Sequence, residues 1–194
     1  MRSSKIVRKT AETEICVALE LDGEGRSEIA TGIGFFDHML TLLVKHSFID
    51  LSVQAKGDLQ VDSHHTIEDC GIVLGQALKA AVAGKEGMHR YGNCFLPMDE
   101  TLAQACLDFS GRPYLVFDVQ LPKVVLGNYD VEMTEEFFRA VAAEAGLTLH
   151  LRVLYGRNTH HIIEALFKAF ARALSDAVAA DARVNGVMSS KGSL

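Results

Sequence analysis

Two kinds of hydrophobic spacing alternate along the chain, and the alternation occurs twice. Apolar and polar residues alternate singly at residues 51–55 and again at 147–153, which predicts β-strands that bury one face. Apolar residues three and four positions apart at residues 35–45 instead predict an amphipathic helix. Each half of the chain therefore reads as strands, a helix, a strand and a second helix. Further strands are expected at residues 14–21, 26–31, 101–109 and 114–119, and a further helix at 131–145.

A short polar motif marks the start of the last helix in each half. The sequence HHTIE at residues 64–68 recurs as HHIIE at residues 160–164, 96 residues later in a chain of 194. Self-similarity at a fixed offset indicates internal duplication. Residues suited to cap a helix N-terminus precede both motifs: Asp62 or Ser63 in the first, and Asn158 or Thr159 in the second.

The duplication and the order of elements predict an α+β fold. The simplest packing is a sheet with helices on one face, with the two halves related by pseudo-symmetry. The only plausible boundary, residues 83–92, is too short and too charged to make the halves independent. We therefore expect residues 1–194 to form one compact unit of two tandem repeats, at about 1–90 and 91–194.

Composition narrows the class of protein. Hydrophobic residues make up 48% and charged residues 23%, which is typical of a soluble globular chain. The net charge of −6 argues against nucleic acid as a partner. No apolar run approaches the roughly 20 residues that span a membrane, so membrane roles are not expected. The four cysteines form no C-x-x-C pair, which favours a reducing cytoplasm as the setting.

The repeated motif has the residue types of a metal site. On a helix, His64 and Glu68 share a face, whereas His65 points elsewhere, so one helix cannot enclose a single ion with all three. We expect each doublet to serve two sites, giving two metals bound by imidazole and carboxylate. Such donors suit Mn(II), Fe(II) or Zn(II). A single motif is more often a cap or a packing feature, but two copies favour metal binding. The candidate ligands on the two helices are His64, His65, Glu68, His160, His161 and Glu164.

Two further candidates lie in the preceding helices. His38 and Glu136 each stand beside a pair of phenylalanines before their doublet and look like repeat counterparts. Glu136 could equally belong to a solvated helical face. His46 lies two turns beyond His38 and could reach the same cleft.

The halves differ in where they carry positive charge. Lys168 follows Glu164 by four residues on the same helical face, where the first copy has Ile72. Arg90 and Arg112 lie near glycines, and Lys191 lies in a Ser-Ser-Lys-Gly tail. Together they could hold a phosphate group, although each alone is more often a surface charge.

Several ordered segments together resemble the imidazoleglycerol-phosphate dehydratase family of histidine biosynthesis, and the resemblance spans essentially the whole chain. These segments are RKTAET at residues 8–13, GIGFFDHML at 32–40, DSHHTIEDC at 62–70, MDET at 98–101, DFSGRPY at 108–114, GRNTHHIIEALFK at 156–168 and SSKGSL at 189–194.

The resemblance implies a fold of the ribosomal protein S5 domain 2-like kind and two Mn(II) ions per active site, with no organic cofactor. It also implies a 24-subunit shell whose sites lie between subunits. Many members of the family have His at the position of Glu136. The positions that match the family's metal ligands are His38, His64, His65, Glu68, His160, His161 and Glu164.

The implied reaction removes water from D-erythro-imidazole glycerol phosphate to give imidazole acetol phosphate. A metal on the substrate's imidazole would favour its anionic form, which expels the hydroxyl through a diazafulvene-like intermediate. Glu12, from a neighbouring subunit, is the candidate general acid or base, and Asp99 would orient the substrate hydroxyls. His46, Glu68 and Glu164 are further catalytic candidates. The resemblance assigns the phosphate to Arg90, Arg112, Lys168, Ser190 and Lys191.

Two other classes of protein could use the same residues. A dinuclear metal hydrolase would act through a metal-bound hydroxide, and its product would not retain the phosphate. A metal-storage shell would bind many more ions per chain. Neither alternative accounts for the positive charges that only one half carries.

Overall fold

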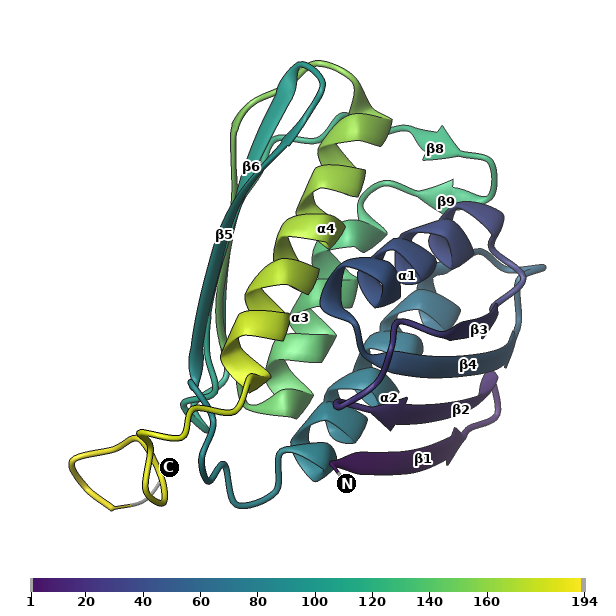
Figure 1. Ribbon diagram of the computed structural model, residues 1–194. Coiled ribbons are helices and arrows are strands. Elements are labelled where there is room, and N and C mark those ends of the chain that lie inside the picture. The colour runs from purple at the N-terminus through teal and green to yellow at the C-terminus, as the bar shows by residue number, and fades with distance from the viewer. Residues whose placement is uncertain (1, 193–194) are drawn as a thin grey trace.

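Residues 2–192 are described by the computed structural model, in which two four-stranded sheets enclose four helices (Figure 1). The first sheet contains β1 (Ser3–Lys9), β2 (Thr13–Glu20), β3 (Ser27–Ala30) and β4 (Asp50–Gly57). The second contains β5 (Tyr91–Met98), β6 (Thr101–Asp108), β7 (Tyr114–Asp118) and β10 (Thr148–Tyr155). The helices are α1 (Gly34–Ser47), α2 (His64–Ala81), α3 (Met133–Ala145) and α4 (Thr159–Val178).

The two sheets have the same topology. The strand orders are β1-β2-β4-β3 and β5-β6-β10-β7, and in each sheet only the last pair is parallel. The helices α1 and α2 cover one face of the first sheet, and α3 and α4 cover one face of the second (Figure 1). The predicted α+β duplication, with helices on one face of each sheet, is confirmed.

Alternation along the strands determines which face meets the helices. On β2, every second residue is buried against the helical layer: Thr13, Ile15, Val17 and Leu19. The helices fill the interior with aromatic rings. The ring centroid of Phe138 on α3 lies 4.9 Å from that of Phe167 and 5.3 Å from that of Phe170 on α4. Burial of this apolar surface is the main force that stabilises the layers.

The two halves meet where α2 packs closely on α3. A Cβ atom at Gly71 would lie 2.7 Å from the carbonyl oxygen of Phe137, and one at Gly75 would lie 2.9 Å from that of Val141. These glycines therefore allow the two backbones to approach within a distance that no other residue permits.

The structure contains elements that the hydrophobic pattern did not predict. The edge strands β1 and β5 begin the two sheets, and a short hairpin joins β8 (Val125–Leu126) to β9 (Tyr129–Asp130). The helix expected from residue 131 begins instead at Met133, because the backbone just before it is occupied in this hairpin. Within residues 2–192, no helix is long and apolar enough to cross a membrane.

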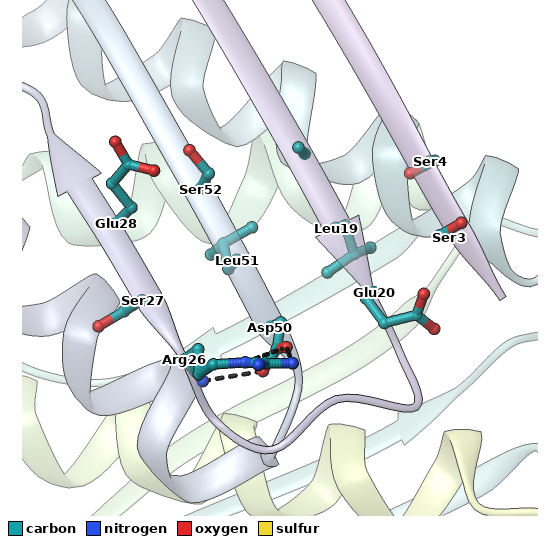
Figure 2. Close-up of a pocket in the computed structure, with 11 residues that line it drawn as sticks. Ser3, Ser4, Leu19, Glu20, Arg26, Ser27, Glu28, Asp50, Leu51 and Ser52 are labelled. Atoms are coloured by element: carbon teal, nitrogen blue, oxygen red, sulfur yellow. Dashed lines mark hydrogen bonds and ion pairs between the residues drawn. The ribbon is translucent and has the colours of Figure 1, made fainter. Parts of the chain in front are cut away.

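A cavity of about 410 Å³ lies on the face of the first sheet that points away from the helices (Figure 2). Small and polar side chains such as Ser3, Ser27 and Ser52 line it, and an ion pair joins Arg26 to Asp50 at 2.8 Å. The hydrogen bond from the backbone N–H of Arg26 is the main reason that the pKa of Asp50 is lowered to about 2, and the ion pair lowers it further. The cavity lies on the opposite face of the sheet from the histidine-bearing helices.

Gly92→Ala should destabilise the fold strongly. A Cβ atom at Gly92 would lie 1.8 Å from the carbonyl oxygen of Ala173, so β5 would have to move away from α4. Overpacking of this kind costs typically 1–3 kcal/mol and occasionally more, and we expect about 3 kcal/mol here. Urea unfolding followed by circular dichroism measures the change. Gly34→Ala is the control, because nothing lies within 4 Å of its Cβ position; equal midpoints for the two variants would contradict the prediction.

Candidate active site

Each histidine doublet is held at the first turn of its helix by a local cap. The Asn158 side chain accepts hydrogen bonds from the backbone N–H groups of His160 at 2.9 Å and His161 at 3.3 Å. In the first half, Asp62 accepts from the backbone N–H of His64 at 2.7 Å, whereas Ser63 makes no side-chain cap. Of the predicted alternatives, Asn158 and Asp62 therefore provide the caps.

His38, His160 and Glu164 come together between α1 and α4. The Nε2 atom of His38 lies 3.5 Å from Oε2 of Glu164, and that of His160 lies 3.2 Å from the same oxygen. The three ligand atoms lie within 4.8 Å of one another, and this is the one such group that residues 2–192 contain. Both histidines are exposed, whereas Glu164 is only 7% exposed. The group is thus open on the imidazole side.

Within one chain, Lys168 lies beside this group and is not among the residues that line the cationic cavity at the other end of the molecule. Its Nζ atom lies 2.5 Å from Oε1 of Glu164, so the two carboxylate oxygens face the ammonium and the imidazoles separately. Burial opposes ionisation of Glu164, but hydrogen bonds from Lys168 and the two histidines outweigh it and hold the pKa below its usual value. Glu164 is therefore ionised at neutral pH, as a metal ligand must be.

His46 lies outside the group of three, although it is on the same helix as His38. The ring is half-buried, and its backbone carbonyl accepts a hydrogen bond from Arg172 at 3.5 Å. Burial, followed by the charges of Lys168 and Arg172, lowers the pKa of His46. The imidazole is consequently neutral at pH 7.

The first half carries a less complete version of the same arrangement. On α2, Nε2 of His64 lies 3.5 Å from Oε2 of Glu68, and both side chains are more than 40% exposed. Glu136 on α3 does not join them and instead lies 3.5 Å from Nε of Arg139. This pair therefore offers two donors where the group on α4 offers three.

Glu136 is nevertheless the repeat counterpart of His38. The helices α1 and α3 both end at a left-handed residue, Phe48 and Gly146 respectively. Counted back from those residues, His38 and Glu136 occupy the same position. The counterpart relation predicted from the neighbouring phenylalanines agrees with the helix register.

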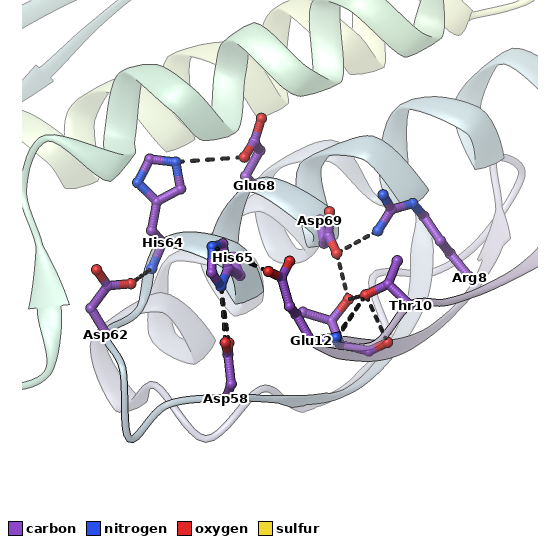
Figure 3. A network of polar contacts seen from close by, with 10 residues as sticks. Arg8, Thr10, Glu12, Asp58, Asp62, His64, His65, Glu68 and Asp69 are labelled. Atoms are coloured by element: carbon purple, nitrogen blue, oxygen red, sulfur yellow. Dashed lines mark hydrogen bonds and ion pairs between the residues drawn. The ribbon is translucent and has the colours of Figure 1, made fainter.

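The second histidine of the first doublet points toward the turn that joins β1 and β2. Nδ1 of His65 lies 3.0 Å from Oδ2 of Asp58, and Nε2 lies 3.9 Å from Oε1 of Glu12 (Figure 3). The hydrogen bond with Asp58 raises the pKa of the ring. Glu12 thus lies beside a histidine of its own chain.

The second histidine of the second doublet, His161, also lies between two carboxylates. Nδ1 of His161 lies 2.8 Å from Oε2 of Glu100, and Nε2 lies 3.9 Å from Oδ2 of Asp99. The hydrogen bond with Glu100 raises the pKa of His161, while that of Glu100 is strongly lowered. Asp58 and Glu100 were not predicted from the sequence. Glu100 lies in the MDET segment that carries the family resemblance, but nothing in the sequence pointed to a contact with His161. The only signal of Asp58 was its position in the loop before the first doublet, which many acidic residues share.

Arg90, Arg112, Ser190 and Lys191 line one cavity of about 810 Å³ at the other end of the molecule. Lys79 and Lys85 add positive charge to its wall. The structure therefore brings four of the side chains predicted for a phosphate group into one cavity, whose positive charge suits an anion.

The C-terminal tail is tied to this cavity through Arg90. Its Nε and Nη2 atoms lie 2.6 and 3.0 Å from the two carboxylate oxygens of Asp108, and Nη1 donates to the carbonyl of Met188 at 2.7 Å. Arg90 also has a positive φ of 72°, a strained conformation typical of functional positions. Residues 193–194, the end of the SSKGSL motif, lie outside the described part of the chain.

The imidazole group and the cationic cavity lie at opposite ends of α4. His160 is at the first turn of the helix, whereas the backbone N–H of Arg90 donates to the carbonyl of Ala177 near the last turn, at 2.9 Å. At a rise of 1.5 Å per residue, the two ends are about 25 Å apart. One small molecule cannot contact both ends within a single chain.

The donor set fits a divalent transition metal. Two ligand atoms bound at about 2.1 Å to one ion lie roughly 3.0–3.5 Å apart. The Nε2 atoms of His160 and His38 lie 3.2 and 3.5 Å from Oε2 of Glu164, which matches this spacing. Imidazole and carboxylate without thiolate suit Mn(II), Fe(II) or Zn(II).

Comparison with known proteins agrees with these features. The imidazoleglycerol-phosphate dehydratase family matches residues 31–174. The dehydratases of Acetivibrio thermocellus and Symbiobacterium thermophilum are each 60% identical over 193 residues, covering 100% of this chain and 99% and 93% of those proteins. The crystal structure of the Staphylococcus aureus dehydratase has a TM-score of 0.84 at 45% identity, covering 92% of this chain and 99% of that one. A Pyrococcus furiosus structure in complex with (S)-C348 has a TM-score of 0.83 at 36% identity, covering 97% and 100%. This chain belongs to the imidazoleglycerol-phosphate dehydratase family.

Proposed function

We propose that this chain is a metal-dependent hydro-lyase that converts D-erythro-imidazole glycerol phosphate to imidazole acetol phosphate in histidine biosynthesis. Membership of the dehydratase family supports the reaction. The observation that carries the proposal is the presence, in one chain, of an imidazole–carboxylate group and a separate cationic cavity. The first suits the imidazole end of the substrate and the second suits its phosphate.

Two Mn(II) ions per active site are the proposed cofactors. His38, His160 and Glu164 would hold one ion and His64 with Glu68 the other, and histidines of other copies would complete both sites. Bound there, the ions would stabilise negative charge on the substrate's imidazole ring.

Glu12 is the proposed proton carrier. The reaction removes a proton from a carbon atom and a hydroxyl group from its neighbour, so a group that accepts and donates protons is required. The Glu12 side chain is 54% exposed and lies beside Nε2 of His65, where it could reach a substrate bound by imidazoles. Asp99, which lies beside Nε2 of His161, is the residue proposed to orient the substrate hydroxyls.

The active site is proposed to form between copies in a 24-subunit shell. The separation of about 25 Å along α4 supports this, because the substrate is much shorter. The outer face of the second sheet also exposes aromatic side chains suited to contact another copy. These include Tyr91, Phe95, Tyr114 and Tyr155, each at least 51% exposed.

Chelation tests the metal requirement. Treatment with EDTA should remove about two ions per chain and abolish turnover, and added Mn²⁺ should restore it. Metal content per chain and light-scattering mass are measured before and after treatment. A rate and an assembly that survive complete removal of the ions would contradict a role for the metal.

Product analysis separates this proposal from its alternatives. The dehydratase product retains the phosphate and is lighter than the substrate by one water. A hydrolase would release inorganic phosphate, and a storage shell would bind many more than two ions per chain without turnover. Mass spectrometry of the product and metal counting distinguish the three.

Arg112→Ala should raise KM while leaving kcat within a few-fold. The exposed guanidinium lines the cavity but, unlike Arg90, does not hold the tail, so its loss should remove phosphate binding alone. A hydrogen bond to a charged group contributes about 1.5–3 kcal/mol, which corresponds to roughly a 10–100-fold change. Steady-state kinetics measures it. Arg152→Ala, which removes an exposed arginine paired with Asp118, is the control. Equal KM values for the two variants would contradict the proposal that the cavity binds the phosphate.

A further inference from the structure

We propose that Asp58 and Glu100 are positioning residues that prepare His65 and His161 to bind metal ions of the active site. The inference rests on the proposed function. Each carboxylate would keep the proton on Nδ1 of its imidazole, which leaves Nε2 bare as the ligand atom and fixes the direction in which it points.

The geometry of the two rings supports this role. A carboxylate oxygen cannot donate, so the contacts of 3.0 Å to Nδ1 of His65 and 2.8 Å to Nδ1 of His161 require a proton on that nitrogen. The Nε2 atoms lie 3.9 Å from Glu12 and Asp99, beyond hydrogen-bond distance. Neither ring belongs to the group of three ligands that this chain assembles from its described residues. Both Nε2 atoms are thus available to another copy.

The two contacts come from positions that are not counterparts in the repeat. Asp58 directly follows β4, and the same place after β10 is occupied by Gly156. A Cβ atom there would lie 2.6 Å from Oγ1 of Thr101 and 2.9 Å from Cγ1 of Ile162, so a side chain at this position would have to displace both neighbours. The second half uses Glu100 instead, which directly precedes β6, where the first half has Glu12 directly before β2.

The use of Asp58 in the first half and Glu100 in the second has a chemical consequence for Glu12. In the second half, Glu100 directly before β6 is hydrogen-bonded to the ring of His161. It also accepts from the backbone N–H groups of Arg157 and Asn158, at 3.1 and 2.7 Å. In the first half, Asp58 holds the ring, so Glu12 is not committed to Nδ1. Duplicated copies of one position therefore differ in function: Glu100 positions a ligand, and Glu12 remains free to transfer protons.

Asp58 allows the cleaner test, because Glu100 also holds the loop before α4. The Mn²⁺ affinity of metal-stripped protein is measured by titration calorimetry for the wild type, Asp58→Ala, Asp58→Asn and Asp62→Asn. Asp58→Ala should weaken Mn²⁺ binding 10–100-fold, the usual effect of losing an outer-shell partner. Asp58→Asn should weaken it less, but at least about three-fold, because the amide oxygen still accepts from Nδ1 without the charge.

Asp62→Asn is the matched control. The substitution removes a negative charge from the same loop, while the amide oxygen of asparagine still accepts from the backbone N–H of His64 and keeps the cap. The side chain contacts no imidazole ring, so the Mn²⁺ affinity should stay within about two-fold of the wild type. Thermal unfolding of the metal-free proteins should differ little, because the pair of His65 and Asp58 lies at the surface, only partly buried, and surface pairs contribute little to stability.

The outcomes separate the inference from the proposed function. The inference is overturned if both Asp58 variants bind Mn²⁺ within two-fold of the wild type, or if Asp62→Asn loses as much affinity as Asp58→Ala. It is also overturned if the variants lose only metal-free stability. Normal Mn²⁺ binding and dehydration by the wild type would leave the proposed function intact in each case. A wild type that binds no Mn²⁺ would overturn both.

Discussion

His160→Ala should reduce metal binding at least about 100-fold and turnover to below about 1% of the wild type. The substitution removes one of the three ligand atoms that the chain brings together, which must cost more than the 10–100-fold typical of an outer-shell residue. The remaining carboxylate of Glu164 would keep its ion pair with Lys168, so the fold itself should persist.

Inductively coupled plasma mass spectrometry and steady-state kinetics measure the two effects. His150→Ala is the control, because His150 is exposed on β10, away from the imidazole group. Normal metal content in His160→Ala would remove this residue from the ligand set. A loss of helical signal would show that the effect arises from folding instead.

Glu12→Gln should lower kcat by about 10²–10⁴-fold, the usual contribution of a general acid or base. Metal content and assembly mass should be unchanged, because Glu12 is exposed and 3.9 Å from the nearest imidazole nitrogen. The amide keeps the shape of the side chain but cannot accept a proton.

The control for this prediction is Glu14→Gln. Glu14 lies two residues further along and pairs with Lys9 at 2.8 Å on the outer face of the sheet. Its kcat should remain within about two-fold of the wild type. Unchanged turnover in Glu12→Gln would exclude Glu12 as the proton carrier.

Much of the fold could be predicted because its signals are local. Alternation of apolar and polar residues identified β4 and β10, stretches rich in β-forming residues indicated β2 and β6, and the doubled motif identified the starts of α2 and α4. The strands β1 and β5 were missed because their hydrophobic pattern is weak. No residue of β1 is buried, and in β5 only Gly92 is buried.

The site was less predictable because it depends on contacts between distant segments. The group of His38, His160 and Glu164 needs α1 to pack on α4, which no local pattern specifies. Within one chain, Lys168 pairs with Glu164 one turn earlier on the same helix, and its predicted role at the phosphate stays a prediction. Glu100 reaches His161 only through the β5–β6 turn, so spacing along the chain gave no indication of the contact.

The separation of the two ends of α4 has a genetic consequence. Damage at one end of a copy leaves its other end intact, so subunits carrying His160→Ala and subunits carrying Arg112→Ala are defective in different halves of the site. If neighbouring copies share each site, a mixed assembly would contain some subunit interfaces at which an intact imidazole group from one copy meets an intact cationic cavity from another. Two alleles impaired at opposite ends would then complement one another when expressed together, whereas two alleles damaged at the same end would not.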